Sequence, residues 1–421
     1  MKILLGTVAH NQHVAQIARS LHEADALGAF YTGGVDVWKS GVAGRVRRYF
    51  GPELDQKLER RRVSDVPESL VFPHWGWETA RLLARMLGSD VAQDWCWERS
   101  EMELDRTCAR VIDLPEFGGF IGTEFGCLAT LNRTHDVHKP AAVIFLSPHH
   151  RTRAMWVDRE YERFPPLLSR ATKKLLDLGA ARDARRDQEA MMSDLLVVAS
   201  SFTANSLIAA GVSSDKIITV PLGCPEVCGP VETQSPRGAV LKFMYSGPVS
   251  VRKGAHYLLR AWKRLAIRRG AELHFYGTVQ LPPTMIDHSD SIYFHGNVSP
   301  TELAKAYDQA DFLIFPTLCD GFGLVVGEAL SHSVPVLTTT NAGAADLIRP
   351  YRNGLIVPPA DTEALAAGMQ WILENRRLLP LFREESRNTA RDWTWRHFRQ
   401  AFLREIPGAF PNLIQVTSPA G

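Results

Sequence analysis

Short apolar runs alternate with segments of helical length along most of the chain. Apolar runs of strand length bounded by turn residues are typical of buried parallel strands, and the longer segments between them are typical of crossover helices. In the first half, this pattern predicts strands at residues 2–5, 110–114, 142–146 and 195–199 and helices at 13–26, 78–87 and 202–210. Residues 28–73 are loop-rich, and no strand or helix is assigned to them.

A second series of the same kind begins at Leu241. It predicts strands at 241–245, 272–276, 291–294, 312–315 and 334–338 and helices at 257–268, 300–309, 325–331 and 362–375. The segment between the two series, residues 221–238, is rich in proline and glycine and is a predicted linker. Aromatic residues spaced by three and four predict a terminal helix at 392–406 that packs one face, back across the first domain.

The two series together predict an α/β chain of two Rossmann-like domains that face each other across a cleft. We expect an N-terminal domain at residues 1–224, a C-terminal domain at 238–391, and a tail at 392–421 that returns to the first domain. Ligands of such folds bind outside the carboxyl ends of the strands, so candidate residues are sought in the loops that follow predicted strands.

Bulk properties exclude several classes of protein. The 421 residues are too many for one ordinary core, and a net formal charge of +2 gives no field that would attract nucleic acid. No apolar run approaches about 18 residues, which excludes a membrane-spanning helix. Only three strongly apolar residues precede Gly6, too few for a secretory signal, so we expect a cytoplasmic protein.

The cysteines give no sign of a disulfide framework or a zinc site. They are scattered through the chain, and only Cys224 and Cys228 lie close together, without a second pair or a His-x-x-x-His to complete a zinc site. We expect reduced thiols and no metal. The six positions are 96, 108, 127, 224, 228 and 319.

The strongest motif follows the predicted strand that ends at Phe315. Asp320-Gly321-Phe322-Gly323 forms a turn, and a helix is predicted to open near Leu324. Free amides and the positive end of a helix dipole at such a turn can receive a diphosphate. Glu328 lies about one turn into the helix, where a carboxylate can accept both hydroxyls of a ribose. Alone, the string also fits an ordinary strand–turn–helix with a solvated acid.

A cationic loop at the same predicted sheet edge strengthens this interpretation. Gly247, Arg252, Lys253 and Gly254 follow the first strand of the second series and precede a helix. A guanidinium fork suits phosphate oxygens and an ammonium adds a compact charge, so the pair could neutralise a departing diphosphate. An isolated Arg-Lys pair would otherwise be read as solvated surface.

Four segments in this order resemble the donor domain of the retaining glycosyltransferases of family four, which have the GT-B fold and are also called glycosyl transferases group 1. The match runs from about residue 240 to 375; in the first half it is weaker and rests on the first strand with Gly6, on 190–203 and on 217–223. The four segments are Gly247 with 252–254, then 294–298, then 320–328, and finally 333–336 with 342–344 and 353–357.

The resemblance implies a role for each matching residue. Arg252 and Lys253 would hold the donor pyrophosphate, Glu328 would bind the ribose, and the loop from His295 to Val298 would flank the nucleobase. The family has Glu at both ends of its acidic motif, whereas this chain has Asp320 at the first position, one methylene shorter. The full set of implied donor-binding residues is Gly6, Gly247, His295, Asn297, Val298, Gly321, Phe322, Gly323, Leu324, Val325 and Glu328.

The first domain is expected to bind the acceptor. His10, Asn11 and His13 follow the first strand and could line that site or serve as surface and capping groups. After the strand at 142–146, His149 is the first candidate to touch the reacting centre and His150 the second. Because adjacent side chains point different ways, only one should face the cleft, and a zinc pair is not expected.

Two further segments allow a contact with a membrane. The aromatic residues at 72–77 with Trp95 and Trp97 fit core packing, a sugar-stacking surface or a lipid-facing surface. Residues 45–62 hold an excess of Arg and Lys among apolar residues, which fits either a solvated loop and helix or an element that touches an anionic membrane.

The sequence therefore predicts a retaining, metal-independent glycosyltransferase of polysaccharide or glycoconjugate biosynthesis. Arg252, Lys253, Asp320 and His149 are its candidate catalytic residues, and its partners are a nucleotide sugar and a sugar, lipid-linked or small-molecule hydroxyl acceptor. An epimerase on the same fold and a catalytically silent binding protein remain alternatives. A nicotinamide-linked oxidoreductase does not fit, since no Gly-x-Gly-x-x-Gly follows the first strand.

Overall fold

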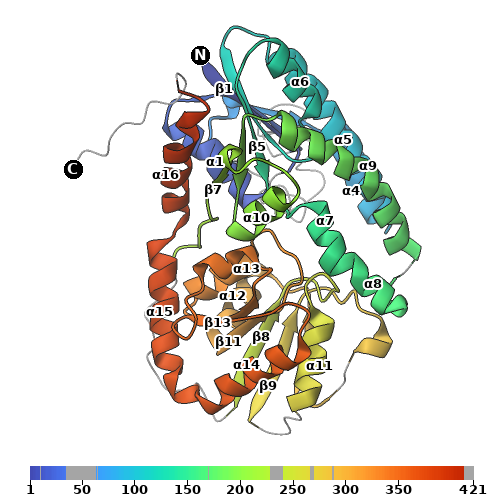
Figure 1. The fold of residues 1–421 in the computed structure, drawn as a ribbon, viewed down its shortest axis with the longest axis vertical. Coiled ribbons are helices and arrows are strands. Elements are labelled where there is room, and N and C mark those ends of the chain that lie inside the picture. The colour runs from blue at the N-terminus through green and yellow to red at the C-terminus, as the bar shows by residue number, and fades with distance from the viewer. Residues whose placement is uncertain are drawn as a thin grey trace, which may run out of the picture.

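The structure is a computed structural model of the 421-residue chain. It describes residues 1–9, 11–34, 63, 65–168, 170–227, 240–265, 270–286 and 289–411. Two parallel sheets, each flanked by helices, form an upper and a lower half in Figure 1.

The upper half contains a seven-stranded sheet in the order β3-β2-β1-β4-β5-β6-β7. The order reverses between β1 and β4, and such a switch point opens a crevice at the carboxyl ends of the strands. The strands are β1 (Lys2–Thr7), β2 (Leu27–Gly33), β3 (Val71–His74), β4 (Phe117–Thr123), β5 (Ala141–Phe145), β6 (Leu195–Val198) and β7 (Ile217–Thr219). The helices are α1 (Gln12–Glu23), α4 (Gly76–Met86), α5 (Asp90–Val111), α6 (Leu128–Asp136), α7 (His150–Arg153), α8 (Arg159–Arg163), α9 (Arg170–Met192) and α10 (Ser201–Ala209).

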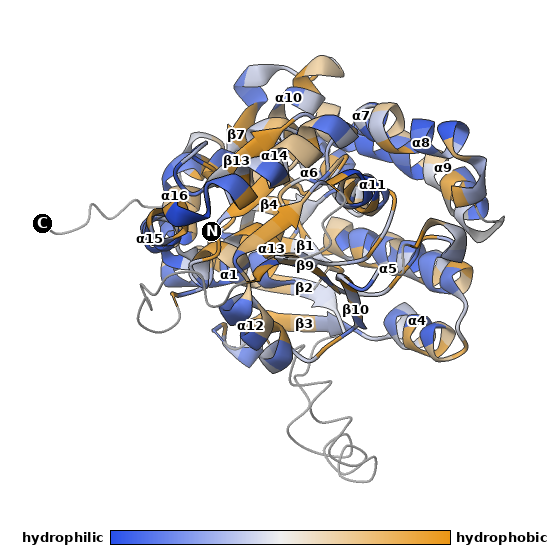
Figure 2. Ribbon diagram, turned by 90° about the horizontal axis from the view of Figure 1, so that it is seen from below, coloured by the Kyte–Doolittle hydropathy of each residue, from blue (hydrophilic) through white to orange (hydrophobic). Residues whose placement is uncertain are grey.

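The lower half repeats the plan with a six-stranded sheet in the order β10-β9-β8-β11-β12-β13, whose switch point lies between β8 and β11. Its strands are β8 (Leu241–Ser246), β9 (Ala271–Tyr276), β10 (Ile292–Gly296), β11 (Phe312–Phe315), β12 (Val336–Thr339) and β13 (Gly354–Val357). Its helices, with the tail, are α11 (Ala255–Leu265), α12 (Pro300–Gln309), α13 (Leu324–Ser331), α14 (Thr362–Glu374), α15 (Leu379–Asp392) and α16 (Trp395–Glu405). In Figure 2 the strands are mostly hydrophobic in colour and the surrounding helices are mixed.

The structure confirms the predicted strands except one and places the predicted helices within about three residues of their expected bounds; the end of the helix predicted at 257–268 falls outside the described residues. The strand predicted at 110–114 is wrong, because this segment is the end of α5 and its cap, where the fully buried Ile112 enters the core. The loop-rich region 28–73 also contains most of β2 and most of β3. A Cβ on Gly28 would lie 2.9 Å from the Phe117 ring, so close packing requires the glycine in this strand.

Contacts between residues far apart in the sequence join the two halves. The tail helix α16 lies along α1, and Phe398 and Phe402 are buried in one apolar cluster that reaches from β1 to α13. Each such ring stabilises the folded chain by about 1.5–3 kcal/mol. On the opposite side, α8 reaches down to α11, as Figure 1 shows, and Glu160 accepts from Tyr257 Oη at 2.9 Å and meets His256 Nε2 at 2.8 Å.

Candidate functional site

Arg252, Lys253 and Asp320 come together at the switch point of the lower sheet. The loop after β8 is pressed onto the loop after β11, since a Cβ on Gly254 would lie 1.9 Å from the Pro316 carbonyl. The carbonyl of Arg252 also accepts from the Leu318 amide at 2.9 Å. These contacts place both cations on Asp320: Arg252 Nη1 lies 3.5 Å from Asp320 Oδ2, and the Lys253 ammonium donates to the same oxygen.

The cluster carries an excess of positive charge. Burial opposes ionisation of Asp320, but Lys253 and Arg252 outweigh it and hold the pKa of that carboxyl below its ordinary value. One carboxylate thus faces two cations, and the Arg252 side chain is 46% exposed. A net positive group with an exposed guanidinium can accept an anion such as a diphosphate.

The predicted turn and helix start lie beside this cluster. Gly323 takes φ 94°, a left-handed conformation that favours glycine, and α13 begins at the next residue. The amides of the first turn, at Leu324 and Val325, therefore have no partner within the helix. At Gly321, an added Cβ would lie 1.8 Å from the Leu146 carbonyl of the upper half. The turn is thus held directly against the loop that follows β5.

Phe322 and Glu328 have more specific surroundings than the sequence suggested. The Phe322 side chain is buried in the core and cannot contact a donor, while its amide donates to Asp320. Glu328 is half-buried on α13, where its Oε2 accepts from Tyr307 Oη at 2.9 Å. The second carboxylate oxygen remains the candidate acceptor for ribose.

The residues expected to flank a nucleobase lie at the same edge of the lower sheet. His295 belongs to β10 rather than to the loop, and its ring stacks on Tyr276 with centroids 4.4 Å apart. Asn297 and Val298 follow the strand and are exposed and half-buried. Gly247, with φ 116°, lies after β8, which is two strands away from β10, and nothing lies within 4 Å of an added Cβ.

The expectation for Gly6 needs correction, because β1 continues past it to Thr7. A Cβ at Gly6 would lie 2.7 Å from Cys108 Sγ of α5. Close packing of α5 on the sheet thus accounts for this glycine, and the loop toward α1 begins two residues later.

A pocket of about 480 Å³ lies between the two halves, next to the Asp320 cluster. The lower half contributes Arg252, Cys319, Asp320 and Gly321, and the upper half contributes the other lining residues, from α5, α7, α9 and the loops after β4 and β5. The wall formed by α9 was not predicted from the sequence. Its signal was a row of arginines and an aspartate at helical spacing, which also fits a solvated helix face.

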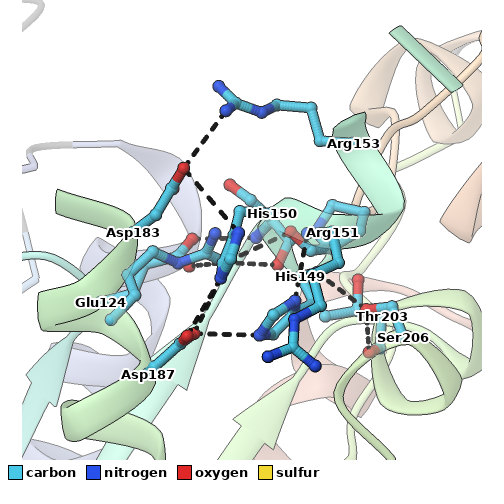
Figure 3. Close-up of polar contacts among 12 residues, drawn as sticks. Glu124, His149, His150, Arg151, Arg153, Asp183, Asp187, Thr203 and Ser206 are labelled. Atoms are coloured by element: carbon cyan, nitrogen blue, oxygen red, sulfur yellow. Dashed lines mark hydrogen bonds and ion pairs between the residues drawn. The ribbon is translucent and has the colours of Figure 1, made fainter. Parts of the chain in front are cut away.

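His149 and His150 do not point different ways, as the sequence led us to expect. Figure 3 shows both rings turned toward Asp187 of α9: His149 Nε2 lies 2.9 Å from Asp187 Oδ1, and His150 Nε2 lies 3.1 Å from the same carboxylate. His149 Nδ1 also accepts from the Arg151 amide at 3.2 Å. Both ring nitrogens of His149 are therefore engaged within the upper half.

His149, His150 and Asp187 are also the group of described residues whose ligand atoms converge, all within 4.8 Å. The prediction that adjacent rings point different ways, on which a zinc pair was not expected, is thus wrong. The tautomer of His149 still favours hydrogen bonding over a metal. Because Nδ1 accepts from an amide, Nε2 must carry the proton of the neutral ring, and it donates that proton to Asp187.

Some expectations fall outside the described residues, namely His10, Cys228 and the basic segment 45–62. The aromatic region is divided, with Trp95 42% exposed beneath Arg99 and Trp97 in the wall of the pocket. No helix in the described ranges has the length and apolar character needed to cross a bilayer. The cysteines at 96, 108, 127, 224 and 319 are free and buried.

Residues 241–375 match the model of the family described as glycosyl transferases group 1. An uncharacterised glycosyltransferase of Methanocaldococcus jannaschii is 27% identical over 138 residues, 31% of this chain and 35% of that protein. An MMP alpha-(1->4)-mannosyltransferase of Mycolicibacterium hassiacum is 26% identical over 204 residues, 47% of this chain and 49% of that protein. The chain thus spans at most about half the length of these curated relatives.

Solved structures extend the likeness to the whole chain. HepE of Anabaena in complex with UDP has a TM-score of 0.62 at 13% identity and covers 97% of this chain and 100% of its own. Sucrose-phosphate synthase of Thermosynechococcus elongatus has a TM-score of 0.60 at 15% identity, covering 98% and 100%. At these identities the likeness establishes the fold, which is GT-B.

Proposed function

We propose that residues 241–375 act as a glycosyl transferases group 1 domain. In this proposal the chain transfers a sugar from a nucleoside diphosphate sugar to a hydroxyl group, with retention at the anomeric carbon. The observation that carries the proposal is the convergence of Arg252, Lys253 and the start of α13 around one carboxylate at the mouth of the interdomain pocket. A UDP complex of one structural neighbour and the transferase names of the relatives support the same donor class.

In the proposed reaction, the bond between the anomeric carbon and the diphosphate oxygen breaks and the acceptor oxygen bonds to that carbon on the same face. The proton of the acceptor hydroxyl passes to the departing diphosphate. Arg252 and Lys253 stabilise the negative charge that grows on the diphosphate, and the first amides of α13 donate to it. Asp320 orients the two cations, and its carboxylate can accept a hydroxyl of the donor sugar.

The proposal does not require a metal ion. Two fixed cations and a helix start already supply the positive charge that a divalent ion would bring to a diphosphate. Cytoplasmic location follows as part of the proposal, because nucleotide sugars are its substrates. A sugar acceptor is favoured over a lipid-linked one, since one neighbour was solved with UDP and glucose.

A donor screen tests the proposal. UDP-, GDP- and ADP-linked sugars are incubated with the protein, and released nucleoside diphosphate is measured by mass spectrometry with and without EDTA and with added sugars. We expect release from at least one donor, unchanged by EDTA, and a product whose anomeric proton has the configuration of the donor. Conversion of the donor without any acceptor would instead identify an epimerase, and binding without release a silent protein.

A further inference from the structure

One face of α9 forms the wall of the pocket opposite the Asp320 cluster. Gly179, Arg182, Asp183 and Arg186 line the pocket, and their spacing of three and four places them on one side of the helix. Asp94 and Trp97 of α5 extend this wall. None of these residues belongs to the donor cluster, so the wall faces the position from which a second substrate would approach.

The two arginines of α9 that line the pocket, Arg182 and Arg186, are buried and paired with carboxylates. Arg182 binds Asp94 with both terminal nitrogens, at 2.8 and 2.6 Å, and its side chain is only 8% exposed. Arg186 pairs with Glu124 and is 5% exposed. Two carboxylates that line the pocket are more accessible than these arginines, since Asp94 is 23% and Asp183 17% exposed.

Each of the three arginines that line this wall, Arg153, Arg182 and Arg186, is already paired with a carboxylate. Arg153 at the rim, 36% exposed, is held by Asp183 at 3.3 Å, a contact visible in Figure 3. This contrasts with the donor end of the same pocket, where two cations face one carboxylate. The paired groups are Arg153, Arg182, Arg185 and Arg186 with Asp94, Glu98, Glu124, Asp158 and Asp183.

We propose that this wall is the acceptor subsite and that it binds an uncharged sugar rather than a phosphorylated or otherwise anionic one. This inference rests on the proposed function. Hydroxyl groups can donate to the free lone pairs of Asp94 and Asp183 without disturbing the ion pairs. A phosphate would have to separate a guanidinium from its carboxylate and leave that carboxylate buried and unpaired, which is strongly unfavourable.

The open space beside Gly179 also supports the proposal. Glycine in the middle of a 23-residue helix is a poor choice for helix stability, and nothing lies within 4 Å of a Cβ added there. The room beside this glycine is part of the pocket. A larger side chain should therefore fill the subsite without disturbing the core.

The experiment measures sugar binding by saturation-transfer NMR and calorimetry. The probes are glucose, galactose, mannose and N-acetylglucosamine, each alone and as its 6-phosphate, with the nucleoside diphosphate that the protein binds already in place. We expect at least one uncharged sugar to bind at least tenfold more tightly than its phosphate. In Gly179→Leu that binding should fall at least tenfold, while nucleotide affinity stays within about twofold and the melting temperature is not lowered.

Two further variants serve as a matched control and as a test of the charge of the wall. Ala184→Leu, on the exposed side of the same helix, is the matched control and should bind sugar like the wild type. Asp183→Asn removes one negative charge from the wall and should reduce the ratio of the affinity for an uncharged sugar to the affinity for its phosphate. Tighter binding of the phosphates, binding of no uncharged sugar, or unchanged sugar binding in Gly179→Leu would overturn the inference. Failure of the wild type to bind any nucleotide would instead overturn the proposed function.

Discussion

Glu101 offers a quantitative test of how the upper half is held together. This residue of α5 is 2% exposed, accepts from the Val8 amide after β1, and approaches Gly126 after β4 so closely that a Cβ there would lie 2.1 Å from Glu101 Oε2. Burial, with the charge of Glu189 nearby, raises the pKa of Glu101 to about 8. A carboxyl group therefore joins two loops at the cleft mainly in its neutral form.

The sign and size of the effect on stability follow from this pKa. The unfolded chain releases the proton near pH 4.5, whereas the folded chain keeps it to about pH 8. Stability from this group is fully present below pH 4.5 and is lost as the pH rises, by about 1.4 kcal/mol per unit. Between pH 5 and pH 8 the free energy of unfolding should fall by about 3 kcal/mol through Glu101 alone.

The substitution Glu101→Gln removes this dependence, because the amide is neutral and its oxygen can still accept from Val8. We expect the melting temperature of the variant, relative to the wild type, to rise by about 5–10 °C between pH 5 and pH 8, measured by calorimetry. Glu103→Gln, on the exposed side of the same helix, should show no such trend. A difference between variant and wild type that is constant across this range would refute the reasoning.

Two further substitutions test the donor site. Glu328→Ala should weaken nucleotide sugar binding by about tenfold, as expected for the loss of a hydrogen bond to a charged group, while turnover at saturating donor changes less. Calorimetry and steady-state kinetics measure the two effects, and a loss of turnover at unaltered affinity would contradict this prediction. Gly321→Ala should separate the halves, because its Cβ would overlap the Leu146 carbonyl. We expect kcat/KM to fall by at least about tenfold with nucleotide affinity nearly unchanged. A variant with the kcat/KM of the wild type would show that this contact is not needed.

The lower half was predicted almost completely from the sequence because its chemistry lies next to its strands. Arg252, Lys253 and Asp320 each follow a predicted strand at the carboxyl edge of one parallel sheet, and strand order alone brings such loops together. The helix at 300–309 was placed without error, with Ser299 and Glu302 forming its capping box.

The upper half was harder to predict for two physical reasons. The first is that buried ion pairs have the same sequence pattern as a solvated surface, so Arg182 and Arg186 gave no sign that they line a pocket. The second is that partners far apart in the sequence decide side-chain direction. His149 and His150 turn to one side because Asp187 lies between them, and no spacing rule contains that information.

The central claim is that the Lys253 ammonium stabilises the departing diphosphate, and a single-turnover measurement of its release tests this most directly. With donor saturating, Lys253→Ala should release diphosphate at least about a hundredfold more slowly than the wild type, a loss of about 2.7 kcal/mol of transition-state stabilisation. Lys263→Ala, an exposed lysine of α11, should match the wild type. Release by Lys253→Ala at the wild-type rate would contradict the account.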